Sequence, residues 1–493
     1  MDMREYLDII DKKGYLCKID QEVDWNLEAA CIGGMVQRVS NGRFGVLFNN
    51  IKGYYPDKGR ITTAALSGPW KRSYRCLAIA MGLPEEISWS ELIKEYFRRW
   101  RNPIKPIEMA ATDAPCKEVI KIGKEASLLD LPIPMVHMLD GGRYSTLHGF
   151  INQDPDTGWT NVALYRFMVK GPRRWASMWS PTTHGSTIFT RKYEMRGQTM
   201  PCCVAIGVDP AIVNVACAAV PSGVCEYDMA GGIAGDPIRL VRAETNNLLV
   251  PAFAEIIVEG EVRPGERTDE GPFGEVVGYT HGRNISPVFR VTAITTRKNP
   301  IVPVTVEGLK FQDDGGIGAH GSSAGQQEWL ERLGLPIRNN SPGFVTVQHA
   351  YSIDPAKPSD VTKCAQAYFS HPKSIWNHWI ALVDKDVSVI DWRDVFEAIA
   401  LNCDPRDLKG NTTDMDAFCH PLFFFTDIEN RFKGTDSAKF FYDATTKFKD
   451  PKFVPLKDRF EQAFPEELQE KLKEKWAKLG FDRRWEDWRD YLL

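Results

Sequence analysis

The sequence carries no large excess of charge of either sign. Its 61 lysines and arginines are nearly balanced by 65 aspartates and glutamates, which leaves a formal net charge of −4. We therefore expect no nucleic acid as a partner, because no overall basic field attracts a polyanion. Of 493 residues, 43% are hydrophobic and 26% are charged, as in ordinary soluble globular proteins. A chain of this length exceeds what one hydrophobic core usually serves, so we expect two or three domains.

The sequence also lacks an uninterrupted apolar run of membrane length and any CxxC pair. The most apolar long stretch, 204–220, carries Asp209-Pro210 near its middle, so it predicts two short buried strands instead of a membrane span. The first residues have neither the basic nor the apolar region of a signal peptide. The 11 cysteines are scattered, and Cys202 and Cys203 lie in an apolar run, which favours free buried thiols. These absences predict a soluble cytoplasmic protein that does not bind a membrane.

Hydrophobic periodicity changes twice along the chain. Up to about residue 115, helical patterns at 4–12 and 89–100 flank a strand at 45–48. From 116 to about 303, short alternating runs are separated by proline, glycine and aspartate, which is typical of an antiparallel sheet or barrel. After 321 a helix precedes alternating strands and helices, which indicates a small α/β domain. The elements predicted there are strands at 344–347 and 380–383, and helices at 326–333, 361–369, 391–401 and 465–481.

The most unusual short segment is Glu270-Gly271-Pro272-Phe273-Gly274-Glu275. Two acids bracket a stretch that favours a bend, so the turn could bring both carboxylates to one site. Like charges that close do not both ionise cheaply, so the pKa of one glutamate should rise toward the range of a proton donor. The alternative is a pair of solvated glutamates on a hairpin loop, since acids that flank turns are common.

Arg166 lies in the mostly apolar run 161–169. Such an arginine is either at the surface, with its stem over apolar area, or paired with acids in a pocket. The surface position is the ordinary one. The acid pair elsewhere in the same predicted sheet favours the pocket.

The segment Gly316-Ile317-Gly318-Ala319-His320-Gly321 matches the GxGxxG pattern of dinucleotide-binding loops. That interpretation requires a strand immediately before the glycines and an acid about 20 residues later. Residues 308–315, which include Phe311-Gln312-Asp313-Asp314-Gly315, separate the glycines from the predicted strand at 301–307, and 339–351 contains no acid. A flexible loop beside the active site is therefore favoured over an NAD-linked oxidoreductase.

Several of these residues resemble the motifs of the UbiD-family decarboxylases. The matches in the middle of the chain are Tyr165-Arg166, the segment 270–275, and the set Asn161, His184 and Glu226. Residues 48–54 resemble the family's N-terminal domain motif, and Lys439 with 443–445 fits the wider family. Residues 244–252 and the tail, 464–468 through 478–481, resemble the fungal ferulic acid decarboxylases in particular. The resemblance extends essentially from end to end.

The resemblance implies a multidomain protein of α/β and α+β class. The central domain would be a split β-barrel-like domain that binds prenylated flavin mononucleotide (prFMN), flanked by N-terminal and C-terminal α/β domains. The expected boundaries are 1–115 for the N-terminal domain, 116–320 for the flavin domain, 321–335 for a linker helix, 336–455 for an oligomerisation domain and 456–493 for a helical tail. A homodimer or a higher homo-oligomer is implied.

The implied activity is reversible, non-oxidative decarboxylation of an aromatic, heteroaromatic or α,β-unsaturated carboxylic acid. Loss of CO2 leaves electrons on carbon that no side chain stabilises well, so an organic cofactor must accept them. In the family, prFMN does so through a covalent adduct with the substrate. Carried over, Arg166 would orient the substrate carboxylate, Glu275 would donate the proton, and Glu270 would support both as an ion-pair partner. A flavin prenyltransferase would supply the cofactor.

The resemblance also selects a metal set of Asn161, His184 and Glu226. One amide oxygen, one imidazole and one carboxylate suit Mn2+ or Mg2+, with phosphate and water completing the shell. A potassium ion near Glu226 is also expected. The expected cofactor-binding residues comprise these three and Ala163, Leu164, Arg166, Thr183, Ala216, Cys217 and Lys373.

Two positions depart from the fungal relatives. His420, before Pro421-Leu422, stands where those proteins have an aromatic clamp, and an imidazole adds a donor and an acceptor there. Pro372 occupies the place of the family's phosphate-binding lysine, with Lys373 adjacent. Ile317, His420 and Leu422 are the expected substrate-pocket residues. Two other functions stay open, a carboxylase running the same chemistry in reverse and a non-catalytic subunit of a carboxylase complex.

Overall fold

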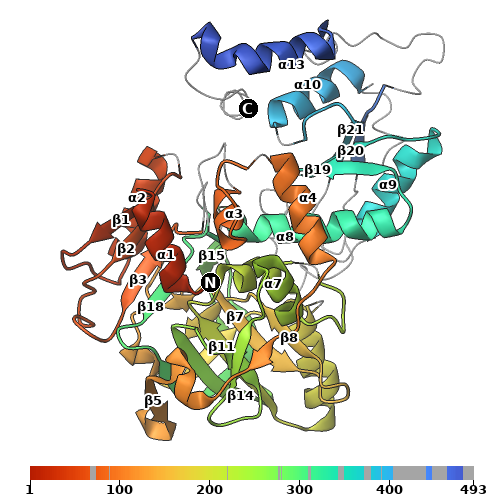
Figure 1. The fold of residues 1–493 in the computed structure, drawn as a ribbon. Coiled ribbons are helices and arrows are strands. Elements are labelled where there is room, and N and C mark those ends of the chain that lie inside the picture. Colours follow the sequence, from red (N-terminus) through yellow and green to blue (C-terminus); the bar gives the residue numbers. More distant parts are fainter. Residues whose placement is uncertain are drawn as a thin grey trace. The chain divides into compact units, whose positions relative to one another are not determined.

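The computed structural model describes residues 1–480 except Asn41, 67–73, 88, 182, 219, 276–277, 279, 309–312, 342–348, 371–378, 390, 404–439 and 447–462. The described residues form two compact units (Figure 1). The first contains Met1–Glu85 and Glu91–Ser322, and the second contains Glu86–Ser90, Ser323–Pro421 and Lys433–Leu493.

The N-terminal part of the first unit is built on a four-stranded sheet with the order β1-β2-β3-β18. Its strands are β1 (Leu16–Ile19), β2 (Gly45–Phe48), β3 (Arg60–Thr63) and β18 (Ile301–Val304). The helices of this region are α1 (Met3–Lys12), α2 (Glu28–Ser40), α3 (Arg75–Ala80) and α4 (Trp89–Trp100). Helix α1 begins with a capping box, in which Asp2 and Glu5 satisfy each other's backbone N–H groups. The helices predicted at 4–12 and 89–100 and the strand at 45–48 are thus confirmed.

The centre of the first unit is a nine-stranded antiparallel sheet with the order β6-β9-β10-β17-β14-β11-β7-β8, in which β5 also pairs with β17. The two longest strands are β14 (Ile256–Glu270) and β17 (Asn284–Thr296). The other strands are β5 (Val119–Ile122), β6 (Tyr144–Ser145), β7 (His148–Gln153), β8 (Thr160–Ala163), β9 (Phe167–Val169), β10 (Arg174–Ser177) and β11 (Met200–Ile206). The antiparallel sheet predicted from the alternating runs is confirmed.

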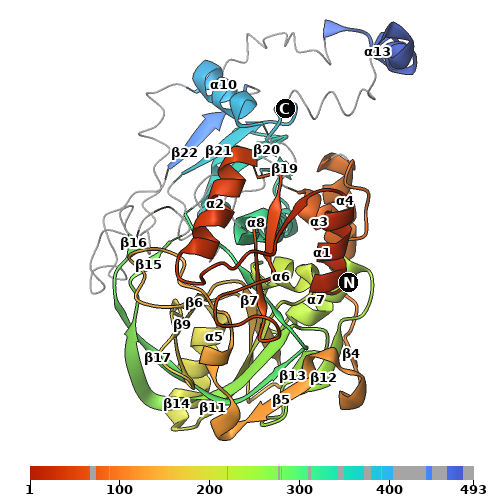
Figure 2. The same cartoon turned by 90° about the vertical axis from the view of Figure 1, so that its left-hand side faces the viewer.

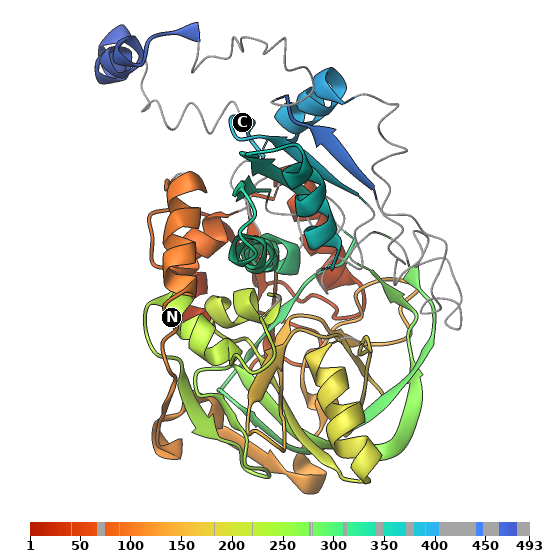
Figure 3. The ribbon, with the colours of Figure 1, turned by 90° about the vertical axis from the view of Figure 1, so that its right-hand side faces the viewer.

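This sheet curves around a helical segment, α5 (His184–Thr187) followed by the π-helix η6 (Ile188–Tyr193) (Figures 2 and 3). Ile188 and Phe189 are buried in one core cluster with Phe150, Phe167 and Trp175 of the strands. The apolar positions of short strands and of one helix therefore share a single core. The two small sheets beside it are β13-β12-β4, made of Leu249–Pro251, Arg239–Arg242 and Ile107–Glu108, and the hairpin β15-β16, made of Phe273–Gly274 and Thr280–His281.

The prediction of two strands in 204–220 is half wrong. Strand β11 ends at Ile206, and α6 (Pro210–Ala216) follows. Asp209 caps this helix by accepting from the Ala211 N–H, and Pro210 occupies its first turn, where no N–H is needed. The apolar residues of α6 are buried on every side, so they have no periodicity that separates helix from strand.

The loop predicted at Gly316–Gly321 is also wrong, because these residues lie within helix α8 (Asp313–Arg332). A β-carbon on Gly318 would lie 2.6 Å from Cys217 Sγ, and one on Gly321 would lie 2.6 Å from the carbonyl oxygen of Asn214. The glycines therefore let α8 approach α6 closely, which is a packing role and not a phosphate-binding one.

The second unit contains a four-stranded sheet in the order β19-β20-β21-β22. Its strands are Ile337–Asn340, His349–Ile353, Trp379–Asp384 and Phe440–Ala444, and β20, β21 and β22 run parallel. Its helices include α9 (Ser359–Ser370), α10 (Trp392–Asn402) and α13 (Glu466–Lys475). The predicted α/β character and the helices at 361–369 and 391–401 are confirmed. The strand predicted at 344–347 lies outside the described residues.

Two further expectations concern the whole chain. Within the part of the chain that the structure describes, no helix is long and apolar enough to cross a membrane. The ten cysteines in that part are all free thiols, and Cys202 and Cys203 are buried in β11, as expected.

Candidate active site

The two glutamates of the 270–275 segment lie where the longest hairpin of the sheet ends. Strand β14 finishes at Glu270, which pairs with Asn284 at the start of β17. Between these two residues the chain makes the small β15-β16 hairpin, in which Phe273 pairs with His281. The two glutamates therefore stand at either end of a short turn with buried Phe273 between them.

Arg166 lies between β8 and β9 and binds both glutamates. Its Nε and Nη2 atoms donate to the two carboxylate oxygens of Glu270 at 2.8 and 2.9 Å, and its Nη1 atom pairs with Glu275. The guanidinium also lies over the Phe273 ring, 4.8 Å from its centroid. Exposed fractions are 9% for the Arg166 side chain, 0% for Glu270 and 17% for Glu275. The structure thus places the arginine in a pocket between two carboxylates, which are separated by a cation and do not face each other.

Burial and charge act in opposite directions on Arg166. Burial alone would lower the pKa of the guanidinium, but Glu275 and Glu270 outweigh it and raise the pKa above the ordinary value. Arg166 is consequently a permanent cation in this pocket.

Two further side chains complete the pocket, and sequence reasoning missed both. Tyr144 donates its hydroxyl to Glu270 at 3.0 Å, and burial, followed by the charge of Glu270, raises the pKa of this hydroxyl. The Nδ1 atom of buried His281 lies 3.3 Å from Nη2 of Arg166 and 3.2 Å from Nδ2 of Asn284. Neither residue has a local sequence pattern that marks it, because strand pairing brings both of them to the site.

The expected metal set converges on strand β8. Asn161 lies on β8, His184 begins α5, and Glu226 begins α7 (Glu226–Ala234); both helices pack against this strand. Glu226 accepts a hydrogen bond from the Val162 N–H at 2.9 Å, and His184 Nε2 lies 3.1 Å from Ser222 Oγ.

The amide of Asn161 is oriented in a specific way. Its Nδ2 group donates to Asn152 at 2.8 Å, which leaves Oδ1 buried without a hydrogen-bond partner among the described residues. Buried polar atoms normally bond to protein, water or a bound ligand, so a group other than the described residues is the expected partner of this oxygen. One amide oxygen, one imidazole and one carboxylate fit a hard divalent cation. Among the described residues, no group of three or more His, Cys, Asp and Glu side chains is suited to a metal.

The other expected cofactor residues surround the same strand. Leu164 donates its N–H to the Ala216 carbonyl at 3.3 Å, which joins the end of β8 to the end of α6, where Cys217 is the C-cap. Thr183 is the N-cap of α5 and accepts from the Ser186 N–H. Ala163 is the last residue of β8. Lys373 lies outside the described residues.

Of the expected substrate-pocket residues, only Ile317 is described. It is fully buried in α8, and its carbonyl accepts from Asn214 Nδ2 at 2.7 Å. Asn214 is held in turn by the Tyr96 hydroxyl at 2.9 Å. His420 and Leu422 lie outside the described residues.

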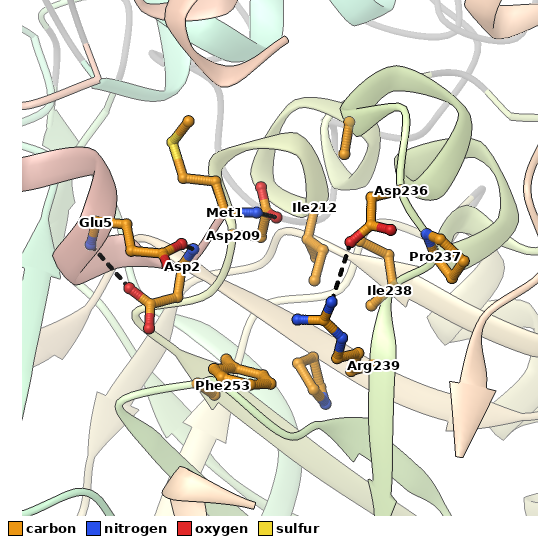
Figure 4. Close-up of a pocket in the computed structure, with 13 residues that line it drawn as sticks. Met1, Asp2, Glu5, Asp209, Ile212, Asp236, Pro237, Ile238, Arg239 and Phe253 are labelled. Carbon is orange, nitrogen blue, oxygen red and sulfur yellow. Dashed lines mark hydrogen bonds and ion pairs between the residues drawn. The ribbon is translucent and has the colours of Figure 1, made fainter. Parts of the chain in front are cut away.

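A small surface cleft of about 70 Å3 lies apart from all of these residues (Figure 4). The N-terminal ammonium group lies in it, 3.1 Å from Asp209, and Arg239 pairs with Asp236 at 3.3 Å. None of the predicted catalytic, metal or cofactor residues lines this cleft, so it is not the predicted active site.

Three family models of 3-octaprenyl-4-hydroxybenzoate carboxy-lyase, UbiD, match the chain in order. The N-terminal domain matches residues 7–96, the Rift-related domain 108–310 and the C-terminal domain 341–418. The chain belongs to the UbiD family of carboxy-lyases, and the resemblance predicted from its motifs is confirmed.

Individual relatives span the whole chain. Pyrrole-2-carboxylic acid decarboxylase of Pseudomonas aeruginosa is 27% identical over 98% of both chains. Ferulic acid decarboxylase 1 of Saccharomyces cerevisiae is 26% identical, again over 98% of both. Among solved structures, an evolved dimeric form of the UbiD-class enzyme HmfF of Pelotomaculum thermopropionicum, in complex with prFMN, has a TM-score of 0.77 and 26% identity. That likeness covers 95% of this chain and 99% of that one.

Proposed function

We propose that this protein is a prFMN-dependent decarboxylase of an aromatic, heteroaromatic or α,β-unsaturated carboxylic acid. The observation that carries the proposal is the Arg166 guanidinium held between Glu270 and Glu275 in one pocket of a UbiD-family fold. The relatives named above that carry a substrate name are decarboxylases of cyclic or aromatic acids, which supports this substrate class.

The residues around β8 suit the cofactor. Asn161, His184 and Glu226 would hold Mn2+ or Mg2+, with a potassium ion near Glu226, and the cation would bind the flavin phosphate. The buried Oδ1 atom of Asn161 supports this assignment, because it has no other hydrogen-bond partner among the described residues. When bound, prFMN supplies the electron sink that amino-acid side chains lack. The curved nine-stranded sheet would be the predicted split β-barrel-like domain.

Arg166 and the two glutamates would divide the remaining work. Glu270 uses both oxygens to fix the guanidinium and is itself held by Tyr144. Arg166 is therefore pre-oriented and would bind the substrate carboxylate through its charge. Glu275 is the more exposed carboxyl group and meets the guanidinium at Nη1, so it is the one suited to carry a proton from solvent to the substrate carbon that loses CO2.

The same site would accept CO2 in the reverse direction, so a physiological carboxylase uses identical residues. A non-catalytic subunit of a carboxylase complex is the other function left open, and the presence of all three charged residues counts against it. The expected partners are a flavin prenyltransferase and further copies of this chain, joined through the C-terminal α/β domain.

The test is co-expression with a flavin prenyltransferase under anaerobic handling, followed by absorbance and mass analysis of the released ligand. We expect about one prFMN per chain and CO2 release from a panel of unsaturated, aromatic and heteroaromatic acids. Purification of apoprotein or of plain FMN alone would contradict the cofactor assignment. Bound prFMN without turnover of any acid would favour the subunit function.

A further inference from the structure

The turn that carries Glu275 is held from outside by the segment 137–141. Asp140 is fully buried and accepts two backbone hydrogen bonds, from Gly274 N to Oδ1 and from His137 N to Oδ2, both at 2.9 Å. The Gly141 N–H donates to the Pro272 carbonyl at 2.7 Å. Asp140 therefore ties the residue directly before Glu275 to the loop that carries His137.

The His137 ring fills the space against this turn. A β-carbon on Gly274 would lie 2.5 Å from His137 Nδ1, so only glycine allows the ring to lie there. His137 Nε2 is 2.9 Å from the Glu307 carbonyl oxygen, and the next residue, Gly308, faces the Glu275 carbonyl. Glu275 is thus flanked by two backbone segments, and His137 bonds or packs against both.

The polar neighbours of the two ring nitrogens of His137 favour its charged form. The Glu307 carbonyl is an acceptor, so Nε2 must carry a proton. Nδ1 lies 3.3 Å from an Asp140 carboxylate oxygen. If Nδ1 carried no proton, its lone pair would repel that oxygen, whereas a protonated Nδ1 forms an ion pair with it. Both ring nitrogens therefore face acceptors.

His137 also reaches Arg166 indirectly, because both side chains contact the Phe273 ring. The His137 ring meets the Phe273 ring edge-on with centroids 5.9 Å apart, and Phe273 also contacts Tyr144, with centroids 4.4 Å apart, and the Arg166 guanidinium. A shift of His137 would therefore disturb Phe273 and, through it, the Arg166 guanidinium that pairs with Glu275.

We infer that His137 and Asp140 form a charged clamp, in which His137 is a positioning residue that carries a positive charge and holds Glu275 against Arg166. This inference rests on the proposed function, because it assigns a role toward the proposed proton donor. It adds a second cation near Glu275, besides Arg166.

The charges around His137 agree with the clamp. Burial acts to lower the pKa of His137, but Asp140, the Glu307 carbonyl and Glu275 together raise it above the ordinary value. Asp140 belongs to its own segment, Glu275 to the facing turn, and the cation Arg166 lies beyond the Phe273 ring. Because coupling between two charges is reciprocal, removal of the Glu275 charge must lower the pKa of His137.

The test is an NMR titration of the full-length protein labelled at its histidine rings, with His137→Gln used to assign the His137 signal. We expect the wild-type midpoint to lie above the ordinary value of about 6.5 and to fall in Glu275→Gln and in Asp140→Asn. The exposed neighbour Met138 provides a matched control, and Met138→Ala should leave the midpoint unchanged. A midpoint that does not respond to Glu275→Gln would overturn the inference.

Turnover gives a second readout. His137→Gln keeps a donor for the Glu307 carbonyl but removes the charge, so kcat should fall about tenfold or more while KM changes little. Wild-type kcat in this variant would overturn the positioning role. The titration needs no substrate, so a protein that decarboxylates no acid but shows the coupled midpoints would refute the proposed function and leave the clamp standing.

Discussion

Replacement of Arg166 by lysine separates the two contributions of this residue, to stability and to catalysis. The guanidinium makes a two-pronged contact with Glu270 and a third contact with Glu275, whereas an ammonium group has no planar fork and cannot reproduce the two-pronged contact. In Arg166→Lys, Glu270 would therefore remain fully buried with its Tyr144 hydrogen bond but without its two charge-assisted bonds.

The expected magnitude follows from these contacts. Two lost charge-assisted hydrogen bonds correspond to about 3–6 kcal/mol, and removal of one partner from a buried ion pair typically costs about 3–5 kcal/mol. The retained Tyr144 bond and a new lysine contact offset part of this, so we expect a destabilisation of about 3 kcal/mol. The rate should fall more steeply, by about 100-fold or more in kcat/KM, because displacement of a positioning group by about 1 Å already has that effect.

The assay compares midpoints of urea unfolding across three variants. Arg166→Lys should unfold at lower urea than wild type, and the double variant Arg166→Lys with Glu270→Gln should recover part of the loss, because no unpaired charge then remains buried. The matched control is Arg263→Lys, whose 2.7 Å pair with Glu261 is half exposed and should contribute less than about 1 kcal/mol. If Arg166→Lys unfolds at the wild-type midpoint, or the double variant is less stable than the single one, the account of the buried network is wrong.

Three further predictions concern the proton, the metal and acid stability. Glu275→Gln should abolish CO2 release but keep wild-type flavin absorbance, since Glu275 is not expected to hold the cofactor; loss of the flavin would count against its role as a proton donor. Asn161→Leu removes the oxygen that has no hydrogen-bond partner among the described residues, so bound Mn2+ and flavin should both fall in metal analysis and absorbance while the circular dichroism spectrum stays native; undiminished metal content would refute the ligand set. Burial lowers the pKa of His148 to about 3. As the pH falls, the unfolded state therefore binds this proton before the folded state does. The free energy of unfolding should fall by about 1.4 kcal/mol per pH unit between about pH 6.5 and pH 3. His148→Asn should flatten this part of the stability–pH curve, and an equal slope in both proteins would show that other groups cause the acid sensitivity.

The helices at 4–12, 89–100, 361–369 and 391–401 were predictable because each has an apolar stripe at helical spacing and one buried face. The fully buried helix α6 and the glycine-rich start of α8 were mistaken for a strand and a loop. In both segments the conformation depends on neighbours that lie close on every side. The periodicity of a segment does not reveal such neighbours.

The candidate site also combines features that the sequence predicts with features that only the fold decides. The sequence by itself determined that Glu270 and Glu275 bracket a bend and that Arg166 stands alone in an apolar run. Only the tertiary structure decided that they meet, because Arg166 and Glu270 are 104 positions apart and are joined by strand pairing. The same holds for Tyr144 and for the His137–Asp140 clamp, whose partners come from distant segments. Spacing along the chain reports local geometry, whereas a buried ion network is selected by the packing of the whole sheet.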